Sequence, residues 1–128
     1  MAEKKNLSID ALPKAVGPYQ HAVEYGGIIY TSAQLPIDAA TKRRVPVDIR
    51  AQTRNVRENL RALLEGCGSS LAKILACRVY ITDMSLFSDV NEIYGTFFEQ
   101  LDPPTRVCVE VSALAKGASI EIEATAYR

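Results

Sequence analysis

Two segments near the C-terminal end alternate strictly between apolar and polar residues, and this alternation constrains the fold more than any other feature. Residues 104–111 read PTRVCVEV and residues 119–124 read SIEIEA. A side-chain period of two is typical of a β-strand that turns one face to the core and the other away from it. We therefore expect strands over 104–111 and 119–127. Their core face is expected to hold Val107, Val109, Val111, Ile120, Ile122 and Ala124.

The opposite face of these two strands carries side chains that can bind ligands or take part in reactions: Arg106, Cys108, Glu110, Glu121 and Glu123. An arginine guanidinium can bind a carboxylate through two parallel hydrogen bonds. A carboxylate beside it can orient a water molecule. The combination suggests chemistry on a small carboxylated substrate.

The rest of the sequence predicts three more strands and two helices. The strands are expected over 20–25, 28–33 and 73–82, and Gly26-Gly27 suits a tight hairpin between the first two. A helix is expected from Ile49 to Cys67 with Asp48 as its N-cap. A second helix should follow a cap at Asp83 or Ser85, with an apolar stripe of Phe87, Val90, Tyr94 and Phe97. Residues 1–12 are expected to be loosely ordered, and residues 35–47 to form a loop with room for one short strand.

The order of these elements predicts an α+β fold. Segment 73–82, the second helix and segment 104–111 form a βαβ unit, whose strands should be parallel with a right-handed crossover. The whole chain then makes a mixed sheet with both helices packed on one face. Two helices cannot cover both faces of such a sheet. The uncovered face, expected to show Tyr19, Arg106, Cys108 and Glu121, should be solvated or buried by further copies of the chain. A small closed oligomer, with pockets at the seams between subunits, is the economical solution.

Composition excludes several classes of function. The 128 residues suit one domain, and the 15 basic and 15 acidic residues give no net charge, which argues against a general nucleic-acid or membrane binder. No apolar run is long enough to cross a bilayer. The first residues, MAEKKN, lack an apolar signal segment, so a cytoplasmic location is expected.

The inventory of metal ligands and nucleophiles is also small. The three cysteines, Cys67, Cys77 and Cys108, are widely spaced without a Cys-x-x-Cys motif, so neither a zinc site nor a disulfide framework is expected. The single histidine, His21, stands in no recognisable nucleophile context for a catalytic triad.

Four arginines of the first helix recur at helical spacing: Arg50, Arg54, Arg57 and Arg61. One interpretation is a phosphate-binding stripe. The simpler interpretation, which we favour, is a solvated helix face that pairs with Glu58 and Glu65.

An ordered set of short motifs resembles the RidA/YjgF family, which is also called the endoribonuclease L-PSP or translation inhibitor family. Each motif is weak by itself, but the set runs in order from about residue 12 to residue 126. The matching segments are Gly17-Pro18-Tyr19, residues 31–36 (TSAQLP), Gln52, Asn59, Phe87, residues 90–94 (VNEIY), residues 104–111, residues 114–117 (LAKG) and residues 121–124 (EIEA).

The resemblance implies a chorismate-mutase-like fold over the whole chain, residues 1–128, and a homotrimer with clefts between its subunits. It also implies enamine/imine deaminase activity without metal or organic cofactor. The substrates would be 2-aminoacrylate and related 2-imino acids released by pyridoxal-phosphate enzymes, and the products 2-keto acids and ammonia.

The resemblance also assigns roles to individual residues. Arg106 would clamp the substrate carboxylate, and Glu121 would position the attacking water. Tyr19, Ser32 and Asn91 match positions that line the substrate pocket. Cys108 is expected to line the same pocket, with its backbone carbonyl helping to hold the water, in preference to acting as a nucleophile.

The sequence departs from the family pattern at a few positions. Gln20-His21 replaces the usual Ser-Gln, and Ala33 replaces a glycine after the serine of the second strand. Thr105 and Ala115 replace residues of the Pro-Ala-Arg and Leu-Pro-Lys-Gly motifs. Ala33 adds a methyl group beside the pocket, and His21 adds a group that could titrate. These changes bear on substrate preference more than on activity.

Two other functions remain open from the sequence. The clefts could bind small carboxylates without catalysis, as a regulatory pocket, since Arg106 would serve that purpose equally. RNA cleavage or translation inhibition would need a basic groove, and only the arginine stripe supports it.

Overall fold

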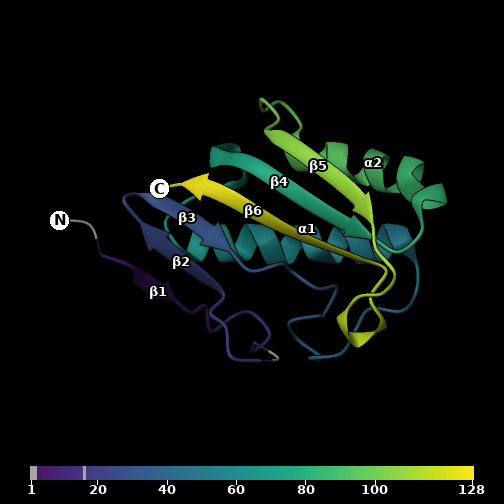
Figure 1. Cartoon of the computed structure of the whole chain (residues 1–128), viewed down its shortest axis with the longest axis horizontal. Helices are drawn as coiled ribbons and strands as arrows, with labels where there is room; N and C mark the ends of the chain where they lie inside the picture. Colours follow the sequence, from purple (N-terminus) through teal and green to yellow (C-terminus); the bar gives the residue numbers. More distant parts are fainter. Residues whose placement is uncertain (1–2, 16) are drawn as a thin grey trace.

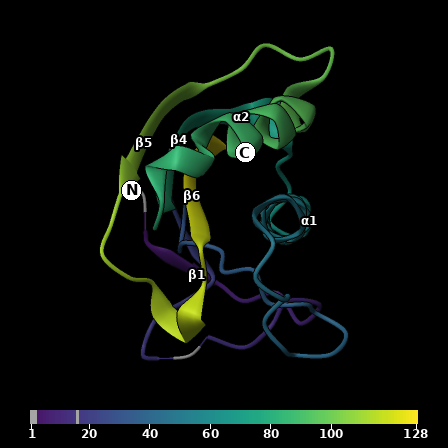
Figure 2. The ribbon, with the colours of Figure 1, turned by 90° about the vertical axis from the view of Figure 1, so that its right-hand side faces the viewer.

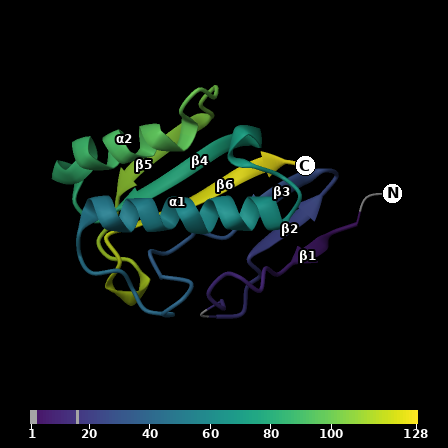
Figure 3. The same cartoon turned by 180° about the vertical axis from the view of Figure 1, so that it is seen from behind.

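The computed structural model describes residues 3–15 and 17–128, which form one mixed sheet with two helices (Figure 1). The strands lie in the order β1-β2-β3-β6-β4-β5. Their bounds are β1 (Lys5–Leu7), β2 (Ala22–Tyr25), β3 (Ile28–Thr31), β4 (Ile74–Ile81), β5 (Thr105–Glu110) and β6 (Ile120–Tyr127). The helices are α1 (Ile49–Gly66) and α2 (Phe87–Gly95). The strands lie in front of the helices in Figure 1, and the view from behind shows both helices on that one face (Figure 3).

This arrangement confirms the predicted fold class. Strands β4 and β5 are connected through α2 and pair directly with each other in parallel. Strand β6 lies between β3 and β4 and is antiparallel to both. The hairpin of β2 and β3 turns at Gly26 and Gly27, whose φ angles of 60° and 81° are easily adopted only by glycine. Neither helix of the described chain is long and apolar enough to cross a membrane.

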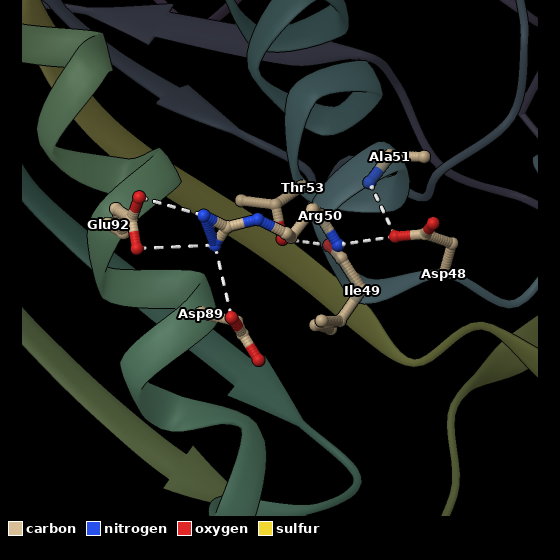
Figure 4. A network of polar contacts seen from close by, with 7 residues as sticks. All are labelled: Asp48, Ile49, Arg50, Ala51, Thr53, Asp89 and Glu92. Carbon is tan, nitrogen blue, oxygen red and sulfur yellow. Dashed lines mark hydrogen bonds and ion pairs between the residues drawn. The ribbon is translucent and has the colours of Figure 1, made fainter.

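Helix α1 begins where the sequence predicts. The Asp48 carboxylate accepts hydrogen bonds from the backbone N–H groups of Arg50 and Ala51, at 3.0 and 3.2 Å (Figure 4). These bonds satisfy two donors that an uncapped helix leaves open. The buried side of α1 packs on the sheet through Val56, Leu60, Leu63 and Leu64, all fully shielded from solvent.

Two buried amides on α1 hold the loop over residues 35–47. Gln52 donates to the Val45 carbonyl and accepts from the Ser119 N–H, which ties this loop to the start of β6. Asn59 donates to the carbonyls of Leu35 and Ile37. Because unpaired buried amides are costly, these bonds fix the loop.

The arginine stripe of α1 is engaged mainly with acidic side chains. Arg50 contacts both Asp89 and Glu92 of α2, at 3.0 and 2.8 Å, and so joins the two helices (Figure 4). Arg57 and Arg61 both contact Glu58 on α1 itself. This pairing supports the interpretation as a solvated face, and each such exposed pair adds little stability.

The N-terminal segment is more regular than the sequence indicates. In its described part, residues 5–7 form β1 and pair with β2, and Leu12 is only 3% exposed. The Ile9 N–H donates to Nδ1 of His21 at 2.9 Å. Strand pairing and one buried leucine thus order a polar stretch whose composition alone suggests a loose end.

The second helix is shorter than its apolar stripe predicts. Asp83 caps a 3₁₀ helix, Met84–Leu86, by accepting from the Ser85 N–H at 2.9 Å. Helix α2 follows directly, and a further 3₁₀ helix, Thr96–Phe98, carries Phe97 into the core.

The assignment of faces on β5 is wrong, although its alternation is correct. Val107 and Val109 are 57% and 39% exposed and lie on the open face of the sheet. Cys108 packs against the core beneath the helices. The alternation distinguishes two faces, but on this edge strand the apolar residues happen to point away from the helices.

Candidate active site

The guanidinium of Arg106 lies in a cradle formed by α2. Its Cζ is 5.4 Å from the centre of the Phe87 ring and 4.8 Å from that of Tyr94. Its Nη1 donates to Oδ1 of Asn91 at 2.6 Å. We name Phe87, Asn91, Tyr94, Arg106 and Cys108 the arginine cluster. Both rings attract the cation, and the amide fixes its rotation.

The spacing along α2 creates this cradle. Phe87, Asn91 and Tyr94 are four and three residues apart, so they share one helical face. That face meets β5, and Arg106 is paired there with buried Cys77 of β4. The sequence does not predict that Phe87 and Tyr94 stack on Arg106. Their spacing around Asn91 is the only signal of it, and the same spacing fits an apolar stripe that packs on the core.

The thiol of Cys108 is placed two residues beyond Arg106 on the same side of β5. Burial raises the pKa of the Cys108 thiol, and the positive charge of Arg106 offsets only part of that effect. A thiol with a raised pKa is a poor nucleophile at neutral pH. The arrangement therefore favours the lining role for Cys108.

Tyr94 completes the floor of the arginine cluster with a buried hydroxyl. Burial raises the pKa of this phenol far above its usual range, and the neighbouring Cys77 thiol raises it further. In the described part of the chain the hydroxyl makes no hydrogen bond of ordinary geometry. Tyr94 is thus held neutral and serves Arg106 through its ring.

A separate cleft of about 490 Å³ contains Glu121. Tyr19, Ser32, Ala33 and Glu121 are among the residues that line it, and we name these four the glutamate cleft. Ser32 donates through Oγ to the Gln20 carbonyl at 2.6 Å. Paired backbone hydrogen bonds between Gln34 and Ile122 hold the Ser32 segment beside β6. The structure therefore brings three of the predicted site residues together.

The two carboxylates of β6 differ in their surroundings. Glu123 accepts from Nε of Arg78 at 2.9 Å and from the Tyr80 hydroxyl at 2.7 Å. Glu121 accepts no hydrogen bond from the residues that the structure describes, and burial, followed by the charge of Glu123, raises its pKa. Glu121 is therefore the carboxylate that is free to hold water and to accept a proton more readily than an ordinary glutamate.

Arg106 and Glu121 point to opposite sides of the sheet. Arg106 lies in a row with Cys77 and Ala124, both buried beneath the helices. Glu121 is paired with Tyr80, which is paired in turn with exposed Val109 on the open face. The expectation that one open face shows Tyr19, Arg106, Cys108 and Glu121 is therefore wrong for Arg106 and Cys108. A single chain holds the arginine cluster and the glutamate cleft as two separate halves.

His21 has a structural position. Its Nδ1 accepts from the Ile9 N–H, so the ring proton resides on Nε2, which donates to the Pro13 carbonyl at 2.9 Å. Both ring nitrogens are thus used to hold the N-terminal segment. Across residues 3–15 and 17–128, no group of three or more His, Cys, Asp or Glu side chains is placed to hold a metal ion.

Comparison with known proteins places the chain in a family. The family described as endoribonuclease L-PSP matches residues 9–128. A RutC family protein of Pyrococcus horikoshii is 42% identical over 125 residues, which is 98% of each chain. TdcF of Escherichia coli, provisionally designated a reactive intermediate deaminase, is 39% identical over 127 residues, again 98% of each chain.

Solved structures agree with these relatives. YyfA of Yersinia pestis, from the Rid protein family, superposes with a TM-score of 0.96 at 40% identity, covering 98% of this chain and 100% of that one. TdcF of E. coli with bound serine superposes with a TM-score of 0.92 at 38% identity, covering 97% and 98%. Matching motifs, fold and relatives over nearly the full length show that this chain belongs to the RidA/YjgF family.

Proposed function

We propose that this protein is an enamine/imine deaminase. Its substrates are 2-imino acids such as 2-iminobutanoate and 2-iminopropanoate, the reactive products of pyridoxal-phosphate enzymes, and its products are 2-keto acids and ammonia. The observation that carries the proposal is that one chain presents, on opposite sides of its sheet, a preorganised, exposed arginine and a carboxylate whose pKa is raised and which is free to hold water. The bound serine in TdcF, a small molecule with a carboxylate, agrees with it.

The active site forms between two copies of the chain. The arginine cluster and the glutamate cleft lie on opposite sides of the sheet, so the Arg106 of one copy meets the Glu121 of the next. The open face also exposes several large apolar side chains, which association would bury: Tyr30, Val107, Val109 and Tyr127. A closed ring with this head-to-tail contact completes every site, and the homotrimer is the ring that the family resemblance implies.

The reaction needs little besides orientation and a path for protons. Arg106 binds the substrate carboxylate, and this fixes the imine carbon opposite Glu121. A water held by Glu121 adds its oxygen to that carbon while Glu121 takes a proton. Glu121 passes this proton to the nitrogen, which gives a tetrahedral adduct with one hydroxyl and one amino group. The hydroxyl proton then moves to the amino nitrogen through Glu121, the C–N bond breaks as the C=O bond forms, and ammonia leaves a 2-keto acid.

Substitutions at the two residues separate their roles. Arg106→Ala loses one or more charge-assisted hydrogen bonds, each about 1.5–3 kcal/mol, so turnover should fall roughly ten- to a hundred-fold. Arg106→Lys should be nearly as poor, because an ammonium group lacks the planar fork. Glu121→Gln should lower the rate while leaving pyruvate affinity similar, since it removes only the proton acceptor. The assay follows decay of the imine with semicarbazide as trap, beside calorimetric titration with pyruvate.

Mixing the two variants tests the shared site directly. After unfolding and refolding together in equal amounts, about one quarter of the sites should hold an intact Arg106 and an intact Glu121, because each is retained with a probability of about one half. Recovery of about a quarter of the wild-type rate is therefore expected. No recovery would place both residues in one subunit, and a monomer mass by light scattering would remove the interface itself.

The same titrations distinguish the regulatory alternative. A non-catalytic binder of small carboxylates would keep Arg106-dependent pyruvate binding but show no acceleration of imine decay over buffer. That result would overturn the deaminase assignment while keeping the cleft.

A further inference from the structure

A second pocket lies next to the glutamate cleft but shares no lining residue with either half of the proposed active site. It has a volume of about 420 Å³ and is lined by Asp10, Leu12, Lys14, Ile37, Lys42 and Lys116, among others. Lys116 belongs to a 3₁₀ helix, Ala115–Gly117, and the other five residues lie outside the strands and helices. The segments that carry them gather at one end of the molecule, below the helices in Figures 1 and 2. We name it the basic pocket.

The basic pocket concentrates positive charge in a chain that has no net charge. Three lysines face the single carboxylate of Asp10, which leaves an excess of two positive charges. In the described part of the chain, the ammonium groups of Lys14, Lys42 and Lys116 make no hydrogen bond or ion pair. Like charges repel one another, so an anion with two negative charges would be favoured there.

Two of the lysines are held in a backbone conformation that is costly for any residue except glycine. Lys42 and Lys116 both have a φ of 62°, and Gln100 is the only other non-glycine residue at positive φ in residues 3–15 and 17–128. Strain of this kind persists only where the surroundings enforce it, and it gathers at sites that clamp ligands. Its presence at two lysines of one pocket is the second observation that points to a ligand.

The surroundings enforce the conformation of Lys42. The turn of Lys42 is closed by the bonds from the Lys42 N–H to the Asp38 carbonyl, at 2.8 Å, and from the Asp38 N–H to the Arg43 carbonyl, at 2.9 Å. The Asp38 carboxylate also accepts from the N–H groups of Ala40 and Thr41. These four bonds preorganise the lysine before any ligand arrives.

The floor of the basic pocket is apolar. Leu12 and Ile37 form it and are already buried, so the apolar surface still open to water comes from half-buried Pro13 and from the methylene stems of the exposed lysines. A fully hydrated inorganic ion would gain nothing from such a floor. A ligand with an apolar group would remove that surface from water.

We propose that the basic pocket binds a small organic dianion that carries an apolar group, such as an aryl or alkyl phosphate or an apolar dicarboxylate. The site is independent of the deaminase proposal. The pocket and the glutamate cleft are neighbours: Ala115 lines the cleft and Lys116 lines the basic pocket. A further pocket between them is lined by Lys14 and Ile37 as well as by Tyr19 and Ala33.

Backbone amide shifts in the ¹⁵N-labelled full chain test the proposal, with phenyl phosphate as probe. Saturable shifts are expected at Leu12, Lys42 and Lys116, with half-saturation on the order of 1 mM for so small a ligand. Inorganic phosphate carries only the anionic group and benzyl alcohol only the aromatic ring, so each should bind more weakly than phenyl phosphate. Added salt should weaken the phenyl phosphate complex, because the pocket is open to solvent.

The decisive variant is Lys42→Gly/Lys116→Gly, which removes two charges and relieves both strained backbones. It should keep or raise the melting temperature while binding phenyl phosphate roughly tenfold more weakly or worse. Lys4→Ala/Lys73→Ala loses the same charge elsewhere and should bind like the wild type. Three results would each overturn the proposal: equal affinity in the glycine variant, equal weakening in the control variant, or shifts confined to the glutamate cleft.

Discussion

Asn91 is predicted to act through Arg106, and its replacement by leucine separates that role from direct contact with substrate. Leucine has nearly the same size but cannot accept the 2.6 Å hydrogen bond from Arg106. A hydrogen bond to a charged group contributes about 1.5–3 kcal/mol, and because Asn91 and Arg106 are both exposed we take the lower end. Asn91→Leu should therefore lower kcat/KM roughly tenfold.

The rings beside Arg106 set the scale for a second substitution. Phe87→Leu removes one of two cation–π contacts, each about 0.5–1 kcal/mol at an exposed site. Its expected cost is roughly two- to fivefold in kcat/KM. Pyruvate affinity should fall in parallel in both variants, because a loosened guanidinium binds the carboxylate of product and substrate alike.

A double-mutant cycle with Arg106→Ala decides between the two roles. If Asn91 only positions Arg106, then Asn91→Leu should cost nothing further once the arginine is gone. Additive losses in rate would show that Asn91 touches the substrate independently, and our reasoning would be refuted. Circular dichroism melts of all four proteins serve as the control for folding.

Three further predictions concern the electrostatics of the chain. Burial and the charge of Glu123 raise the pKa of Glu121, so the acid limb of the pH profile of kcat/KM should lie above the ordinary glutamate value of 4.5. Glu123→Gln should move this limb to lower pH. A limb that does not move would belong to a group other than Glu121. Cys108→Ser should retain activity within about twofold. Wild-type Cys108 should react slowly with iodoacetamide at pH 7, since the pKa of its thiol is raised. An inactive serine variant would support a nucleophilic role for Cys108. Arg128→Ala should lower the free energy of unfolding in urea by about 1–2 kcal/mol, because it leaves the Glu24 carboxylate, which is only 8% exposed and lies 2.8 Å from Arg128, without its partner. The exposure of Arg128 limits the cost. Adding Glu24→Gln to the Arg128→Ala variant should recover part of that loss.

The fold could largely be predicted because its elements are marked by local chemistry. Asp48 caps α1, Gly26-Gly27 turns the first hairpin, and the alternation in β6 puts Ile120, Ile122 and Ala124 in the core. Strand β1 could not be predicted in this way. Its three residues owe their order to pairing with β2 and to the bond between Ile9 and His21, which are distant in sequence.

The sequence proposes which residues belong to the candidate site but not how they are arranged. The family motifs indicate Arg106, Glu121, Tyr19, Ser32, Asn91 and Cys108, and the structure sorts them into two groups. On β5 the alternation of Val107 with Cys108 shows that the faces differ, but either face could be the inner one. Only the position of α2, with Phe87 and Tyr94 against Arg106, settles which face the helices cover.

The hydrogen bonds of His21 also make the protein its own spectroscopic probe. The chain has one histidine, so its imidazole gives a single set of resonances that needs no assignment by mutagenesis. The Nε2 proton donated to the Pro13 carbonyl should exchange slowly with solvent and resonate at low field for as long as that bond is closed. Watching this one signal during titration or heating reports when the N-terminal strand detaches from the sheet, separately from the melting of the core.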